Sequence, residues 1–332
     1  MAELVILDVG HGNCAVIHED GSAIVVDAAP SQALPALLDN LEIEEISCLL
    51  ISHADADHVS GAISLLADER RPVRRVFVNP DARKTACWRD FRVAVGDTVR
   101  RSGTRVVPTL CRSYPNDVAI GDVKVEVLFP TECFALTTAD GTTVGGIKLN
   151  PNTMSGVIKV SIGEEAVCLL AGDMTRDSLD EIVSEDIDIS APLLVFPHHG
   201  GLPGKADVAG FVGDIMGRVE PSMVYFSHGR NKFSNPRKEV VDHVSASKKK
   251  PFIACSQLSR TCGVENPNNV KGRVFECSEG FLSGSSCMGT VRLKLAPSCV
   301  DEFIDKSGSL HSSFVKSTYG SPMCKGCDLL PG

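Results

Sequence analysis

The sequence lacks several features that would place it in a common class of protein. It has no apolar run of about 18 residues, the length that a membrane-spanning helix requires, so we expect no membrane contact. Its first residues show no basic segment followed by an apolar core and a cleavage site, so we expect a cytoplasmic protein. It has no glycine loop of the Walker or dinucleotide-binding type and no internal repeat, which excludes those common nucleotide sites and repeat folds.

The composition fits a globular protein with a large core. Of the 332 residues, 43% are hydrophobic and 23% are charged, enough apolar surface for one large domain or two ordinary ones. The net charge of −9 argues against a protein that binds nucleic acid over its entire surface. The segment Glu69–Arg112 is an exception, because it holds twelve Lys and Arg against four Asp and Glu, a net charge of +8. A local phosphate-binding surface is therefore compatible with the acidic total.

Short apolar segments alternate with helical ones over most of the chain. Ile46–Ile51 is apolar on both faces and predicts a buried strand, and a helix is expected from His58 to Ala67. This mixture predicts a layered α/β fold. The basic run before Pro251 marks a boundary between a domain over residues 1–248 and a Cys-rich C-terminal extension over 249–332.

The strongest chemical signal follows the predicted strand at Ile46–Ile51. His53, Asp55, Asp57 and His58 lie within six residues, and two imidazoles with two carboxylates so close together favour a bound cation. The structural alternative is a polar helix start in which Asp57 is the N-cap.

Three further signals also follow predicted strands. Asp173 ends Leu169–Asp173, where a carboxylate could bridge two metal ions, or could simply cap the next helix. His198 and His199 stand between Pro197 and Gly200, a context that is rarely packed in a core. His228 follows Val224–Ser227 and is either a ligand or proton donor, or an ordinary surface histidine.

The order of these motifs resembles the metallo-β-lactamase superfamily. Residues 53–58 match its His-x-His/Asp-x-Asp-His motif, and Asp27 resembles its first aspartate. The chain is most similar to the ComEC-like nuclease domains, whose opening Asp-Val-Gly-Gln-Gly-Asp appears here over residues 8–13. Their Asn-x-x-Ser, Gly-Asp and Pro-His-His-Gly appear at Asn152–Ser155, Gly172-Asp173 and residues 197–200.

The resemblance covers about residues 3–245 and implies an αββα sandwich with a metal site at one edge of the sheets. We assign His53 and Asp55 to one metal ion, Asp57 and His58 to a second, and Asp173 to a bridge between them. His198 would complete a coordination sphere, and His199 or His228 would protonate the leaving oxygen. The expected catalytic residues are Asp57, Asp173, His199 and His228.

Some positions depart from the family pattern. Asp55 stands where a second histidine is more common, and this carboxylate makes Mn²⁺ as well as Zn²⁺ a suitable ion. Asn152 lies near the place of the family's middle histidine, and an amide oxygen is a weaker ligand. Ser234-Asn235-Pro236 stands where ComEC-like chains often have Gly-His-Pro.

The resemblance favours a phosphodiesterase or nuclease that uses a metal-bound hydroxide on nucleic acid or a nucleotide. One alternative is a hydrolase of a lactam, lactone or thioester, in which the same hydroxide attacks a carbonyl group. Another is a non-catalytic, metal-stabilised interaction protein with a protein partner.

Thirteen cysteines are unevenly placed, and seven of them lie in the last 83 residues. Without a secretory signal, reduced thiols or a metal site are expected rather than disulfides. We predict a structural zinc site from Cys255, Cys262, Cys324 and Cys327, with simple burial of the thiols as the equal alternative.

Overall fold

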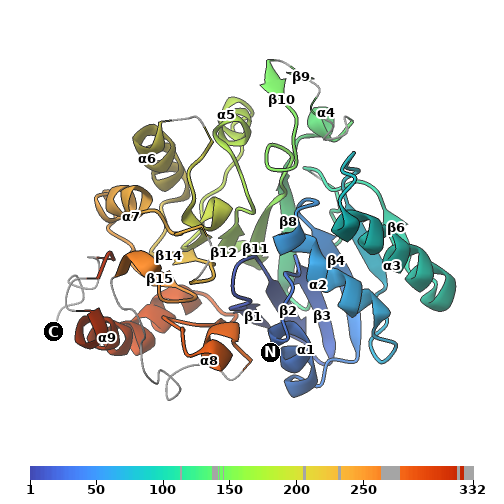
Figure 1. Cartoon of the computed structure of the whole chain (residues 1–332), viewed down its shortest axis with the longest axis horizontal. Coiled ribbons are helices and arrows are strands. Elements are labelled where there is room, and N and C mark those ends of the chain that lie inside the picture. Colours follow the sequence, from blue (N-terminus) through green and yellow to red (C-terminus); the bar gives the residue numbers. More distant parts are fainter. Residues whose placement is uncertain are drawn as a thin grey trace.

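The protein is described from a computed structural model. The description covers residues 1–112, 114–136, 141, 143–144, 146–204, 207–230, 233–262, 277–319 and 322–324. Two seven-stranded sheets pack face to face, with helices on both outer sides (Figure 1).

The first sheet has the order β16 (Val291–Lys294), β1 (Glu3–Ile6), β2 (Ala15–Glu19), β3 (Ser22–Val26), β4 (Glu45–Ile51), β5 (Arg75–Val78) and β6 (Arg105–Val107). The second has the order β15 (Phe252–Cys255), β14 (Met223–Phe226), β13 (Leu193–Val195), β12 (Glu165–Leu170), β11 (Val157–Ile162), β8 (Val123–Phe129) and β7 (Ala119–Ile120). A separate hairpin pairs β9 (Thr143–Val144) with β10 (Ile147–Lys148).

Helices cover the two outer faces. The first sheet carries α1 (Ala33–Asn40), α2 (Ala56–Ala67) and α3 (Ala86–Ser102), and the second carries α5 (Arg176–Ser184), α6 (Val208–Val219) and α7 (Lys238–Ser245) (Figure 1). The remaining helical elements are α4 (Glu132–Ala135), η1 (Pro197–Gly200), η2 (Arg260–Cys262), α8 (Glu279–Ser283) and α9 (Cys299–Tyr319). Among the described residues, no helix has the length and apolar character needed to cross a membrane.

The strands are apolar on both faces because each face meets a different layer. In β1, Leu4 and Ile6 pack between the two sheets, whereas Val5 packs under the helices of the first sheet. In β13, Leu193 faces the inter-sheet core and Leu194 the helices of the second sheet. This period of two explains the continuous hydrophobic runs in the sequence and confirms the expected αββα sandwich.

The expected C-terminal extension contributes to both sheets in its described part. β15 pairs in parallel with β14, and β16 pairs antiparallel with β1. Side chains at both ends of α9 contact the hydrophobic clusters of the molecule, Val300 in the inter-sheet core and Val315 among the helices of the second sheet. The division of the chain at residue 248 therefore does not coincide with a break in the sheets.

A buried ion pair joins β1 to its neighbours. The carboxylate of Glu3 accepts hydrogen bonds from His18 of β2 (3.1 Å) and from Nε of Arg292 of β16 (3.1 Å). Burial raises the pKa of Glu3, but the interactions with His18 and Arg292 outweigh it and lower the pKa to about 2. Glu3 is therefore ionised at neutral pH and helps to hold the edge strand β16 in place.

Candidate metal centre

The ends of several strands meet at one edge of the sandwich. Asp27 follows β3 and His53 follows β4 in the first sheet, while Asp173 follows β12 and His198 follows β13 in the second. β3 and β4 run parallel to each other, as do β12 and β13, so the carboxyl ends of each pair lie together. Ligand sites of α/β sheets are commonly built at such an edge.

One cluster of potential metal ligands consists of His53, His58 and Asp173. Nε2 of His58 lies 3.1 Å from one carboxylate oxygen of Asp173, and Nε2 of His53 lies 3.8 Å from the other. All three donor atoms lie within 4.8 Å of one another, and all three residues are buried.

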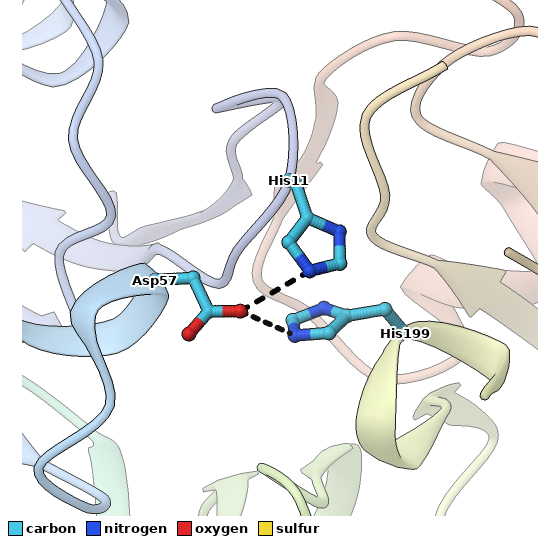
Figure 2. Close-up of side chains that lie close together, drawn as sticks. All are labelled: His11, Asp57 and His199. Carbon is cyan, nitrogen blue, oxygen red and sulfur yellow. Dashed lines mark ion pairs between the residues drawn. The ribbon is translucent and has the colours of Figure 1, made fainter. Parts of the chain in front are cut away.

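A second cluster consists of His11, Asp57 and His199, again within 4.8 Å. Oδ2 of Asp57 lies 3.2 Å from Nε2 of His11 and 3.4 Å from Nε2 of His199, so both rings point at the same oxygen (Figure 2). Nε2 of His199 is also 3.5 Å from Oδ1 of Asp173, which links the two clusters.

Acceptor groups fix the orientation of the imidazoles from behind. Nδ1 of His58 donates to Asp27 (2.7 Å), and Nδ1 of His199 donates to the backbone carbonyl of Ser227 (2.8 Å). Nδ1 of His53 contacts the hydroxyl groups of Ser52 (3.0 Å) and Ser155 (3.2 Å). In each ring Nε2 is thereby left facing the cluster, as in metal-binding histidines.

Unusual backbone conformations bring the ligands into place. His198, His199 and Gly200 have φ values of +52°, +55° and +74°, a left-handed turn directly after β13. Two successive non-glycine residues in this region indicate local strain that the surrounding structure supports.

The loop that carries His11 depends on a glycine. Gly12 has a φ of +139°, and a Cβ there would lie 2.3 Å from the carbonyl oxygen of Asp57, so this loop can approach α2 only with glycine at this position.

The donor set fits a divalent cation. Nε2 of His53, His58 and His199 and Oδ1 of Asp173 are buried, and each makes no hydrogen bond to any described residue. Leaving four such atoms without partners is costly unless a cation takes their lone pairs. Imidazole and carboxylate together suit Zn²⁺ and Mn²⁺.

The electrostatics of the centre are consistent with this fit. Burial, reinforced by the neighbouring His58, lowers the pKa of His53 to about 3 and keeps its ring neutral. Burial raises the pKa of Asp57, but the facing rings of His11 and His199 outweigh it, so the pKa lies far below its usual range. Burial lowers the pKa of His58, but the carboxylates of Asp173 and Asp27 outweigh it and raise the pKa well above its usual range. Asp57 is therefore ionised and His53 neutral, whereas binding of a cation by His58 releases a proton.

Helix capping, the alternative to metal binding for Asp57 and Asp173, is not observed for either residue. Asp57 is not the N-cap of α2, since the helix begins at Ala56 and Asp57 lies in its first turn. Asp173 does not cap α5, because the side chain of Thr175 caps that helix by accepting a hydrogen bond from the backbone of Ser178. The carboxylates of both aspartates instead point into the clusters.

The grouping of the ligands differs from the expected one. Asp57 and His58 were expected at the same ion, but they fall in different clusters, because successive helical residues point about 100° apart. Asp55 was expected beside His53. One of its oxygens lies 3.5 Å from Nε2 of His53, and the other forms an ion pair with Arg83.

His198 lies beside the clusters, whereas His228 is buried away from the cleft. Nδ1 of His198 lies 3.2 Å from Asp173 and 3.2 Å from the amide nitrogen of Asn152, and its side chain is 38% exposed. His228 is completely buried, neither a surface histidine nor one that a substrate reaches. Burial lowers the pKa of His228 to about 3. His228 does not line the cleft, so its buried ring is not placed to donate a proton to a substrate there.

A cleft of about 400 Å³ opens over the clusters. Its lining residues are His11, Asp55, Asp57, Asp173, His198, His199, Gly201, Leu202, Phe233, Asn235 and Arg237. No motif in the sequence indicated a site role for His11, Phe233 or Arg237. For His11 the signal was its place in the glycine-flanked motif of residues 8–13.

The basic segment Glu69–Arg112 is largely paired. Eight of its twelve cationic side chains form ion pairs with carboxylates: Arg70, Arg71, Arg74, Arg75, Arg83, Arg89, Arg100 and Arg112. Several of the partner carboxylates, such as Glu45 and Asp117, lie outside the segment. The segment is therefore not a row of unpaired cations.

The structure locates part of the predicted zinc site in the tail. Cys255 and Cys324 are buried in the hydrophobic cluster under the helices of the second sheet, and Cys262 packs against the same cluster. Cys327 lies outside the described residues. The four-cysteine site therefore stays a prediction.

Several solved structures are similar to this chain at low sequence identity. Igni18, a metallo hydrolase from the hyperthermophilic archaeon Ignicoccus hospitalis KIN4/I, is 14% identical, with 89% of this chain and 100% of that chain covered and a TM-score of 0.47. A diphosphatase of the PhnP family is 14% identical, with coverage of 69% and 87% and a TM-score of 0.38. Human tRNase Z, short form, is 14% identical, with coverage of 68% and 92% and a TM-score of 0.38.

A search of curated proteins finds no match. Among protein-family models, the metallo-beta-lactamase superfamily matches residues 7–228, a range that contains both clusters and all four strand ends that carry them. The chain belongs to the metallo-beta-lactamase superfamily.

Proposed function

We propose that this protein is a metal-dependent phosphodiesterase that acts on nucleotides or nucleic acid, in the ComEC-like branch of its superfamily. The observation that carries the proposal is the position of Asp173. Its Oδ1 faces His58 and His199, one from each cluster, while its Oδ2 faces His53. A carboxylate shared by two adjacent cation sites is the arrangement found in two-metal phosphatases and nucleases.

His53, His58 and Asp173 would hold one ion, and His11, Asp57 and His199 the other. Divalent ions at such sites lower the pKa of water toward neutrality and neutralise the charge that develops on a phosphoryl group. Asp27 and the carbonyl of Ser227 keep His58 and His199 in the orientation that this requires.

Side chains around the cleft would handle the substrate. His198 lines the cleft and is partly exposed, so its ring N–H can donate a hydrogen bond to the leaving oxygen. Arg237 lines the same cleft and carries a full positive charge, which favours an anionic phosphodiester over a neutral lactam or thioester. This charge is the reason for preferring phosphodiester to carbonyl chemistry.

The test is turnover of bis(4-nitrophenyl) phosphate by the purified protein with added Zn²⁺ or Mn²⁺, beside a chromogenic lactam and a chromogenic thioester. We expect metal-dependent release of 4-nitrophenolate from the phosphodiester, with a loss of at least a hundredfold in Asp57→Asn and Asp173→Asn. Asp122→Asn removes an exposed carboxylate and serves as the control with unchanged turnover.

Turnover of only the lactam or the thioester would assign the protein to carbonyl hydrolysis. Metal binding without turnover of any of the three would favour the non-catalytic, metal-stabilised interaction protein.

A further inference from the structure

The cleft over the two clusters has a rim that differs chemically from its floor. Histidines and aspartates of the clusters form the floor, while Leu202, Phe233 and Arg237 lie among the other lining residues. Its volume of about 400 Å³ is within the range of sites that enclose a small molecule, roughly 300–1,000 Å³. The cleft is thus suited to one compact group placed over the clusters.

Phe233 presents an aromatic face at this rim. Its side chain is 67% exposed, and its ring centroid lies 4.9 Å from that of His11. Phe233 and Ser234 both have a φ of +52°, a left-handed conformation that is unfavourable for a bulky residue. Strained backbone of this kind concentrates at binding sites. Leu202, which is 42% exposed, adds apolar surface to the same cleft.

Arg237 adds a positive charge beside this aromatic face. Its backbone N–H donates to the carbonyl of Gly200 (2.8 Å), which ties the start of α7 to the left-handed turn that carries His198 and His199. Its side chain is exposed, and its guanidinium forms no ion pair with any carboxylate in the described part of the chain. Most arginines of the basic segment, by contrast, are already paired with carboxylates.

We propose that Phe233 and Arg237 form a nucleotide subsite of the cleft. An unpaired nucleobase stacks on the ring of Phe233, and Arg237 pairs with the phosphate that lies over the metal clusters. Since a base inside a duplex has no free face, the substrate is a nucleotide phosphodiester or an unpaired strand end. This inference rests on the proposed phosphodiesterase function.

The test compares two phosphodiesters with the same leaving group, thymidine 5′-(4-nitrophenyl phosphate) and methyl 4-nitrophenyl phosphate, in the presence of Zn²⁺ or Mn²⁺. We expect a kcat/KM at least tenfold higher for the thymidine ester. Phe233→Leu keeps an apolar side chain but removes the ring, so it raises KM for the thymidine ester about tenfold and leaves the methyl ester unchanged. Phe233→Trp keeps the preference, and Arg237→Gln raises KM for both esters.

Tyr114→Leu is the matched control, because Tyr114 is a partly exposed aromatic residue that does not line the cleft. It leaves both esters unchanged. Equal kcat/KM for the two esters, or an equal effect of Phe233→Leu on both, refutes the base subsite. Hydrolysis of the esters would still support the proposed phosphodiesterase function.

Binding of thymidine 5′-monophosphate, measured by calorimetry on the metal-supplemented protein, separates the two proposals. If neither ester is hydrolysed, the phosphodiesterase fails. In that case binding that is weakened about tenfold by Phe233→Leu still supports the subsite, and binding that is absent or unaffected by Phe233→Leu refutes it.

Discussion

Replacing Asp27 with asparagine tests whether the candidate metal centre depends on the groups behind its ligands. The carboxylate of Asp27 accepts hydrogen bonds from the backbone of Ser52 (2.7 Å), the hydroxyl of Ser52 (2.8 Å) and Nδ1 of His58 (2.7 Å). Asparagine has nearly the same volume, but it replaces one carboxylate oxygen, a hydrogen-bond acceptor, with an NH₂ group. That NH₂ group is itself a donor and cannot accept the hydrogen bonds of Ser52 or His58. His58 then loses the charged partner that fixes its ring.

The expected loss of metal affinity is tenfold to a hundredfold, the usual effect of removing a partner behind a ligating histidine. This corresponds to about 1.4–2.7 kcal/mol. The mispaired amide also lowers the free energy of unfolding by about 1–3 kcal/mol in the metal-free protein. Affinity is measured by competition with a chromogenic chelator for Zn²⁺, and stability by urea denaturation with a chelator present.

Glu3→Gln is the matched control, since it alters a buried, hydrogen-bonded carboxylate at the far edge strand pair β1–β16. It lowers stability but leaves the affinity for Zn²⁺ unchanged. The reasoning is refuted if Asp27→Asn loses stability while its affinity stays within twofold of the parent. A parent protein that binds no divalent ion would remove the candidate centre altogether.

Three further outcomes are expected. Adding Zn²⁺ or Mn²⁺ at about one hundred times its Kd to chelator-treated protein stabilises the fold by about 2.7 kcal/mol, seen as a higher Tm, and an unchanged Tm counts against the centre. Gly12→Ala, whose Cβ would lie 2.3 Å from the carbonyl of Asp57, destabilises by about 1–3 kcal/mol in urea, whereas Gly213→Ala in α6, with open space around the new Cβ, stabilises by roughly 0.5–1 kcal/mol. Equal effects of these two substitutions would contradict the role of the close loop contact. Because the pKa of Glu3 falls from 4.5 to about 2 on folding, its contribution of up to about 3 kcal/mol is present above pH 4.5 and is lost as the pH falls toward 2. Acid titration of Glu3→Gln should show a shallower loss of stability over that range than the parent, and superimposable curves would disprove the assignment.

Local elements were predictable where periodicity and turn chemistry are strong. The apolar run Ile46–Ile51 is β4, observed over Glu45–Ile51, and the helix expected from His58 to Ala67 is α2, observed from Ala56. Both follow from side-chain patterns that depend on neighbours in the chain. The same patterns placed His53, Asp173 and His198 after strands, and the structure places these residues at one edge of the sandwich.

The sequence by itself determined the alternation of strands and helices of a layered α/β fold and the residue types at the strand ends, because both are properties of short segments. Tertiary structure decided which ligands share a cluster, since that depends on the direction in which α2 presents Asp57 and His58. It also brought His11, Phe233 and Arg237 to one cleft, although more than 200 residues separate the first from the other two. No local pattern encodes that proximity, because it arises only when the two sheets pack face to face and the loops from each meet at their common edge.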